Sequence, residues 1–206
     1  MTFILENNLD ISAWVGVIID MHAQSIPLWK NNGILLDHAG GLGLAEANHS
    51  FNHQLWYAED RARRSDLGSD FVMQAKRAID QHNQNRNDRV EQLDTWLFNQ
   101  LNPSTKNTCS VHSETPGMMI DRLSILALKS YNMGLQTQRL EVSPEHRDAC
   151  LDKLNVINAQ RDQLQQCLVQ LLQEVQQHTR TFRVYHQFKM YNHTHLNPEL
   201  YLQEQA

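Results

Sequence analysis

The chain has 206 residues, enough for one domain with a sizeable buried core, and its eight glycines and five prolines are few for that length. Runs of β-branched residues are scarce, so the composition favours an all-α fold, with residues 1–206 in a single helical domain. The net charge of −5, without any face rich in lysine and arginine, argues against nucleic-acid binding.

The cysteines and the hydropathy pattern bear on the cellular compartment. Cys109, Cys150 and Cys167 lie far apart and are odd in number, which is typical of reduced thiols in an intracellular protein. The N-terminal residues lack a positive region followed by a long apolar run, and no stretch is long enough to span a bilayer. We therefore expect a cytoplasmic protein without membrane association.

The first two helices are predicted from their apolar periodicity. Residues 11–30 carry apolar side chains at helical spacing. Residues 40–43, Gly-Gly-Leu-Gly, are interpreted as a flexible connector, because no phosphate-loop pattern follows them. The second helix is predicted over residues 44–64, where Glu59 and Arg63 lie one turn apart and are expected to form an ion pair.

The histidines of the second helix allow two interpretations. Glu46, His49, His53 and Asp60 fall on one face, and His-x3-His is a valid metal spacing on a helix. A di-iron bundle, however, needs Glu-x-x-His on two helices, and only Glu46–His49 fits. We favour a solvent-exposed polar face for His49 and His53, and we expect no bound zinc or iron.

A third helix is predicted over residues 69–100, with one charge inside its apolar stripe. Arg86 stands where an apolar residue is expected, and a buried arginine needs a carboxylate partner. Glu59, Asp60 and Asp121 are the candidate partners.

Acidic residues also recur every three positions on the third helix. Asp88, Glu91 and Asp94 have a spacing that serves Mg²⁺ in some all-helical phosphohydrolases, because hard cations prefer several carboxylate oxygens on one face. The spacing alone favours an ordinary acidic surface.

Residues 113–133 predict a central helix. Thr115 is its expected cap, and Pro116 fits the first helical position, where the missing N–H is no loss. The segment is apolar almost all the way round, so other helices must surround it, yet it also carries charged residues that need partners. Because Gly117 has no side chain to block approach, we expect this helix start to open into a polar cavity and bind an anion.

The longest helix is predicted from Ser143-Pro144-Glu145 to about residue 178. Its apolar seam is typical of bundle packing and also allows a homodimer. Arg161 interrupts the seam and, like Arg86, is expected to pair with a carboxylate from another helix. The aromatic tail, residues 182–206, is expected to dock on the resulting bundle of about five main helices.

Several long strings together resemble one known family. They are Asn52–Arg63, Lys76–Asp80, Asn83–Asp88, Glu114–Gly117 with Ile120–Ser124, Gln187–Asn192 and Leu196–Pro198. They are similar to DUF4254, a bacterial family of unknown function, and the resemblance covers most of the chain. Members of that family are often associated with surface-polysaccharide gene clusters, so the resemblance implies a sugar or sugar-phosphate context.

The start of the central helix and the charged side chains of the predicted helices together indicate a pocket for an anionic ligand such as a sugar phosphate or nucleotide sugar. Glu59, Asp60 and Asp121 are the candidate catalytic bases or ligands of Mg²⁺, the one cofactor considered, although no recognised nucleophile or metal motif accompanies them. The alternative is a non-catalytic structural or regulatory helical protein, whose buried arginine–acid pairs fix the helix register. The candidate ligand-binding residues are Asn52, Trp56, Arg63, Asn83, Arg86, Thr115, Gly117, Arg122, Lys129 and Arg161.

Overall fold

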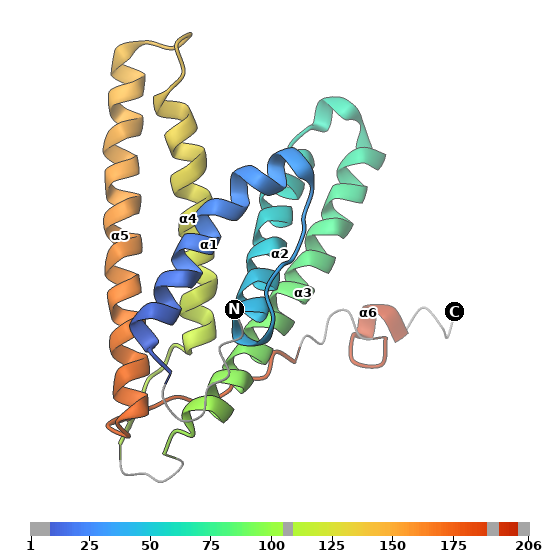
Figure 1. The fold of residues 1–206 in the computed structure, drawn as a ribbon. Helices are drawn as coiled ribbons and strands as arrows, with labels where there is room; N and C mark the ends of the chain where they lie inside the picture. Colours follow the sequence, from blue (N-terminus) through green and yellow to red (C-terminus); the bar gives the residue numbers. More distant parts are fainter. Residues whose placement is uncertain (1–8, 105–108, 189–193, 202–206) are drawn as a thin grey trace.

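The computed structural model describes residues 9–104, 109–188 and 194–201, and within them it is almost entirely helical (Figure 1). The five long helices are α1 (Ile11–Asn32), α2 (Gly40–Ala62), α3 (Ser69–Leu101), α4 (Pro116–Thr137) and α5 (Pro144–Gln176). The short elements are a 3₁₀ turn (Ser65–Leu67), β1 (Ser110–Val111), β2 (Arg180–Thr181) and α6 (Pro198–Tyr201). The predicted all-α bundle is confirmed, and none of these helices is long and apolar enough to cross a bilayer.

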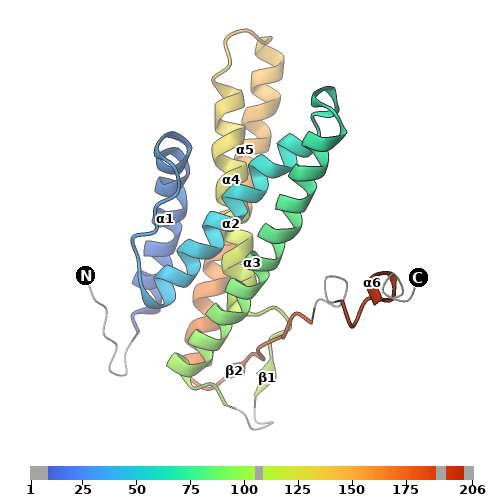
Figure 2. The ribbon, with the colours of Figure 1, turned by 90° about the vertical axis from the view of Figure 1, so that its right-hand side faces the viewer.

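Two helical hairpins and one crossing helix make up the bundle. Helices α2 and α3 form one hairpin, α4 and α5 form the other, and α1 crosses both (Figures 1 and 2). The hairpins converge near the parallel pair of β1 and β2 (Figure 2) and diverge towards their turns (Figure 1). Helix α4 contacts each of the other four long helices, so it is the central element that its apolar sequence predicts.

The main apolar core lies where the hairpins converge. It receives side chains from all five long helices and from the segment after β2, where Phe182 is fully buried. Burying a leucine or isoleucine side chain contributes about 1.5–3 kcal/mol relative to leaving it in water, so this core fixes how the hairpins meet. Its members on α3 and α4 are Leu93, Leu97, Leu101, Met119, Ile120 and Leu123.

Two helix starts have the caps that the sequence predicts. The Thr115 hydroxyl accepts a hydrogen bond from the Met118 amide at 3.2 Å, and the Ser143 hydroxyl accepts one from His146 at 3.3 Å. A proline occupies the first helical position after each cap. Both predicted starts are therefore confirmed.

The glycine run at residues 40–43 is the first turn of α2, so its interpretation as a flexible connector is wrong. Gly41 is buried against Trp96 of α3, and a Cβ at this position would overlap the indole ring. The absence of a side chain at Gly41 is what lets α2 and α3 approach closely here.

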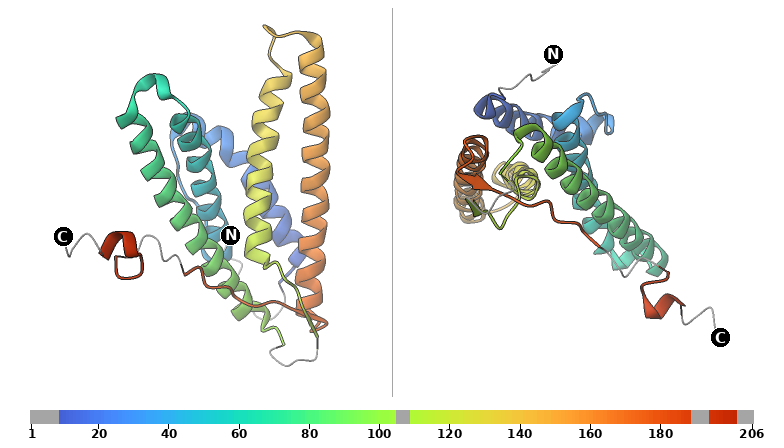
Figure 3. Two further views of the ribbon diagram at one scale, coloured as in Figure 1. Left: turned by 180° about the vertical axis from the view of Figure 1, so that it is seen from behind. Right: turned by 90° about the horizontal axis from the view of Figure 1, so that it is seen from below.

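The C-terminal tail docks over its first part. Phe182 packs edge-on against Phe98, and Glu91 of α3 accepts a hydrogen bond from the Gln187 amide at 3.2 Å and contacts the His186 ring at 2.5 Å. Phe188 is exposed, and α6 stands apart from the long helices (Figure 3). Docking is thus confirmed as far as residue 187, while residues 189–193 and 202–206 lie outside the described ranges.

Candidate functional site

The polar centre of the bundle is built on Asp121 of α4. Its carboxylate is buried and faces α2 and α3, where Arg86 binds it with two parallel hydrogen bonds. Arg86 Nε donates to Oδ1 at 2.8 Å and Nη2 donates to Oδ2 at 2.6 Å. The expectation that Arg86 pairs with an acid from another helix is confirmed, and of the three candidates the partner is Asp121.

Two asparagines of α2 complete the surroundings of this carboxylate. Asn48 and Asn52 each donate a side-chain hydrogen bond to Asp121 Oδ1, at 3.0 and 2.9 Å. Asn52 also donates to the Ser124 hydroxyl at 2.9 Å. Both oxygens of Asp121 are therefore engaged, and the carboxylate acts as a positioning group that holds Arg86 and the two amides in place.

A group of buried histidines lies behind this network, between α1, α2 and α4. His49 Nδ1 lies 2.7 Å from the Ser124 hydroxyl, and the centroid of the tilted His22 ring lies 4.5 Å from that of the His49 ring. Trp29 packs against His49 and His53. The predicted solvent-exposed face for His49 and His53 is wrong, because α1 covers this side of α2 and the centre of α4 supplies a hydroxyl partner.

Burial keeps these histidines neutral. It lowers the pKa of His22 to about 3, against the opposing effect of the Asp121 charge, and it lowers the pKa of His49 well below the ordinary value. Several ring nitrogens, including both of His22, have no hydrogen-bond partner among the residues that the structure describes. Across the described parts of the chain, no three histidine, cysteine or acidic side chains are arranged to hold a metal ion.

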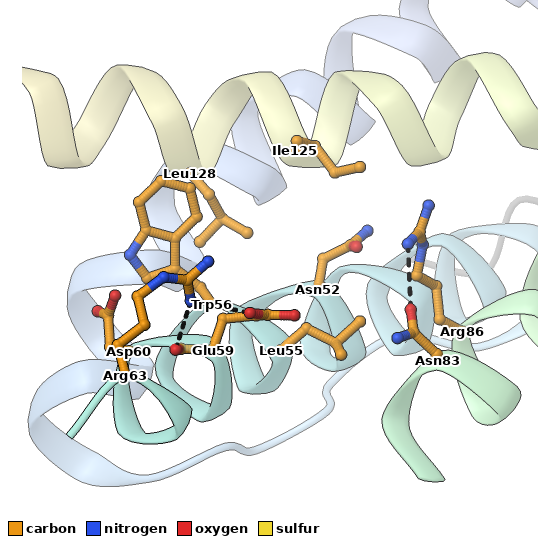
Figure 4. A pocket seen from close by; sticks show the side chains of 10 residues that line it. All are labelled: Asn52, Leu55, Trp56, Glu59, Asp60, Arg63, Asn83, Arg86, Ile125 and Leu128. Atoms are coloured by element: carbon orange, nitrogen blue, oxygen red, sulfur yellow. Dashed lines mark hydrogen bonds and ion pairs between the residues drawn. The ribbon is translucent and has the colours of Figure 1, made fainter. Parts of the chain in front are cut away.

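An open cavity of about 350 Å³ lies in front of Arg86, between α2, α3 and α4 (Figure 4). Its apolar wall combines the Trp56 indole with leucine and isoleucine side chains, and polar groups stand at both ends. Asn52, Asn83 and Arg86 lie at one end, and Glu59, Asp60 and Arg63 lie at the other (Figure 4). Leu55, Ile125 and Leu128 complete the lining.

The charges of the cavity are mostly compensated within it. Arg63 Nη1 donates to Glu59 Oε2 at 2.8 Å, which confirms the predicted pair on α2, and Arg86 is neutralised by Asp121. Asp60 is exposed and forms no ion pair with any residue in the described ranges. The end of the cavity near Asp60 is consequently the more negative one, and the end near Arg86 carries the fixed guanidinium.

A comparison with protein family models shows which family the chain belongs to. The model of DUF4254, a protein family of unknown function, matches residues 43–184. The chain belongs to the DUF4254 family. No curated protein and no solved structure matches the chain. Every residue that lines the cavity lies inside the matched range, whereas His22 and Trp29 of α1 lie outside it.

The structure brings most of the predicted site residues together. Seven of them line the cavity of this DUF4254 protein, and Asp121 stands directly behind Arg86. The seven are Asn52, Trp56, Glu59, Asp60, Arg63, Asn83 and Arg86. The other predicted residues, Thr115, Gly117, Arg122, Lys129 and Arg161, lie elsewhere.

The start of α4 is closed, contrary to prediction. The Gly117 amide donates to Asp94 Oδ1 at 2.6 Å, and a Cβ on Gly117 would lie 2.7 Å from that oxygen. Thr115 is fully buried beside it. Asp94 of α3 thus takes the place that an anion was expected to occupy, and burial raises the pKa of this carboxyl to about 6 despite the hydrogen bonds from Thr115 and Gly117.

The row of acids on α3 is divided among separate partners. Asp88 accepts a hydrogen bond from Gln84 at 2.7 Å, Glu91 holds the tail, and Asp94 closes the start of α4. The three carboxylates therefore do not converge on a common point, as a Mg²⁺ site would require.

Three predicted cations lie away from the cavity. Arg122 and Lys129 lie on the side of α4 that faces α5, where Arg122 Nη1 donates to Glu114 Oε2 at 2.8 Å. Arg161 pairs with its neighbour Asp162 at 3.2 Å, so the prediction of a partner from another helix is wrong.

Sequence reasoning missed Asn48, His22 and Ser124 as members of the polar centre. A signal for two of them is present in the sequence. Asp121 and Ser124 are three residues apart on a helix that is otherwise apolar all round, so the helix facing them must supply donors. Asn48 and Asn52, spaced by four, meet that requirement on α2.

Proposed function

We propose that this DUF4254 protein binds a phosphorylated sugar in the cavity between α2, α3 and α4. The observation that carries the proposal is the combination of an aromatic wall, Trp56, with hydrogen-bonding side chains at both ends of one open cavity. Ligand sites are typically largely apolar cavities with a few polar groups that fix the orientation of the ligand.

The end of the cavity near Glu59 and Asp60 suits the sugar ring. Carboxylates accept hydrogen bonds from hydroxyl groups, and Asp60 has its oxygens free of ion pairs within the described residues. The apolar face of a sugar ring packs on an indole, which Trp56 offers beside them. A phosphate at this end would meet the negative charge of Asp60, so the sugar rather than the phosphate belongs here.

The end near Arg86 suits the phosphate. Asp121 holds the guanidinium through Nε and Nη2, and this leaves Nη1 directed towards Asn83, whose Oδ1 lies at 3.4 Å. A guanidinium fixed in this way is a preorganised donor for phosphate oxygens. The side-chain amide of Asn83 adds a neutral donor beside it, whereas both N–H groups of Asn52 are already engaged by Asp121 and Ser124.

The cellular context that we propose is surface-polysaccharide metabolism. It follows from the association of DUF4254 members with gene clusters of that kind, and it agrees with a ligand that contains both a sugar and a phosphate. Glu59 and Asp60 are the candidate bases for any reaction on the bound sugar, because both line the cavity, whereas the oxygens of Asp121 are engaged by other side chains.

Calorimetric titration with glucose 1-phosphate tests the proposal, with glucose and inorganic phosphate as partial ligands. We expect binding of the sugar phosphate to be weakened about tenfold in Asn83→Ala, since one polar contact to a charged group is worth about 1.5 kcal/mol. Asn87→Ala, one turn further along α3 and outside the cavity, is the matched control and should bind like the wild type.

A structural role is the second candidate, favoured by the complete pairing of Arg86 with Asp121 and of Arg63 with Glu59. In that case, the ion pairs fix the helix register and the cavity has no ligand. No heat of binding and no thermal stabilisation by sugars, sugar phosphates or nucleotide sugars would support this second candidate.

A further inference from the structure

A second cavity, of about 660 Å³, lies on the other side of α4. It is formed by α4, α5 and the segment before α4, and its lining includes Arg122, Lys129, Gln160, Gln163 and Cys167. Nothing in the proposed sugar-phosphate site uses these residues.

The charge in this second cavity is positive. Arg122 is compensated by Glu114, which binds it with both carboxylate oxygens. Lys129 forms no hydrogen bond or ion pair with any described residue, so its ammonium charge is uncompensated. Gln160 and Gln163 add neutral amide donors from α5. A group with negative charge is therefore the chemistry that this cavity recognises.

The two cavities adjoin along α4. The Ile125 side chain lines both of them, and Arg122 and Lys129 lie on the same face of the helix as Ile125, three residues before and four residues after it. One helical turn, about 6 Å, separates Ile125 from Lys129 along the helix axis. A ligand that leaves the first cavity past Ile125 thus enters a region that carries a free positive charge.

We infer that the cavity between α4 and α5 binds the second phosphoryl group and the attached nucleoside of a nucleoside diphosphate sugar whose sugar lies against Trp56. This inference rests on the proposed function and narrows its ligand class. The first cavity, at about 350 Å³, matches a sugar with one phosphate, and the second provides the further volume and charge that a nucleoside diphosphate requires.

Cys167 makes the inference testable, because it is an exposed free thiol in the second cavity. In a Cys109→Ser variant, with Cys150 buried, iodoacetamide reports the accessibility of Cys167. UDP-glucose should slow this alkylation and should also quench the fluorescence of Trp56, which is isolated by comparison with a Trp56→Phe variant. Both effects should have the same half-saturating concentration of UDP-glucose. Glucose 1-phosphate should change only the Trp56 signal.

A charge variant provides the second part of the experiment. Lys129→Met should weaken UDP-glucose binding about tenfold and leave glucose 1-phosphate binding unchanged, since one charge-assisted contact is lost. Lys153→Met, on α5 and outside both cavities, is the matched control. If UDP-glucose changes Trp56 fluorescence but neither protects Cys167 nor responds to Lys129→Met, the inference is wrong and the proposed function stands. If neither ligand changes either signal, both fail.

Discussion

The polar centre of the bundle depends on one side chain, the carboxylate of Asp121. It accepts hydrogen bonds from Arg86 on α3 and from Asn48 and Asn52 on α2, so three helices meet at its two oxygens. The loss of any one of these partners should destabilise the fold, because the buried charge of Asp121 is then no longer fully compensated.

Removal of the Arg86 side chain should therefore destabilise the fold strongly. We expect Arg86→Ala to lower the free energy of unfolding by about 3 kcal/mol, because it leaves Asp121 buried and unpaired. Arg63→Ala breaks an exposed pair on the same cavity and should lower it by less than about 1 kcal/mol. Urea unfolding of both variants measures the difference, and equal losses would show that the Arg86–Asp121 pair has no special weight.

The buried histidines should make the fold sensitive to acid. The pKa of His22 is about 3 in the folded chain and about 6.5 when the chain unfolds, so the unfolded state binds more protons between these values. The contribution of His22 to stability is present above about pH 6.5 and is lost as the pH falls towards 3. Asp94, with its pKa raised to about 6 from 3.8, contributes in the opposite direction between those two values.

The variant His22→Leu separates these two effects. This variant replaces the titratable imidazole with an apolar side chain. We therefore expect the free energy of unfolding to fall less steeply than in the wild type as the pH is lowered from 6.5 to 4. Chemical unfolding at a series of pH values provides the measurement. A pH dependence identical to that of the wild type would mean that His22 is not the group responsible.

Among the elements, the start of α4 departs most from what its sequence predicts. Pro116 and the Thr115 cap are local features, and both are present as expected. The identity of the group that meets the Gly117 amide depends on which face of α3 lies opposite, and local sequence does not determine that. Asp94 fills the position, and the helix start becomes a structural contact between α3 and α4.

Substitutions at two glycines of α4, Gly117 and Gly134, test this contact by comparison. Gly117→Ala should lower the free energy of unfolding by about 1–3 kcal/mol, because its Cβ would lie within 3 Å of Asp94 Oδ1 and the Val90 carbonyl oxygen. At Gly134 a Cβ meets nothing within 4 Å, so Gly134→Ala should raise stability by about 0.5–1 kcal/mol through helix propensity. Thermal unfolding compares them, and a neutral Gly117→Ala would contradict the closed helix start.

For the whole molecule, the sequence predicts the helices well and their mutual contacts less well. The five long helices follow from apolar spacing and from caps such as Ser143, which are properties of neighbouring residues. For Arg86 the sequence predicts a carboxylate partner but leaves three acids possible, because its place in an apolar stripe does not show which acid lies opposite. The polar pattern around His49 and His53 predicts a solvent-exposed face, because it does not reveal that α1 covers this side of α2.

The candidate site shows the same difference between features within one helix, which the sequence predicts, and contacts between helices, which it does not. The spacing of polar residues on α2 indicates which of them share a helix face, and Asn52, Trp56 and Glu59 line one cavity. The sequence also places the cations of α4 in this cavity, but Arg122 and Lys129 lie on the neighbouring face of α4, which lines the cavity against α5. The sequence of α4 is apolar nearly all round, so it does not indicate which of its faces meets which hairpin.

A crystal structure of the protein with glucose 1-phosphate at saturating concentration would show directly whether the cavity between α2, α3 and α4 binds a sugar phosphate. The proposal predicts electron density for the sugar ring against Trp56, with its hydroxyls near Glu59 and Asp60, and for the phosphate within hydrogen-bond distance of Arg86 Nη1 and the Asn83 amide. Clear density for the cavity side chains with no sugar phosphate between them, at a concentration well above any measured dissociation constant, would contradict it.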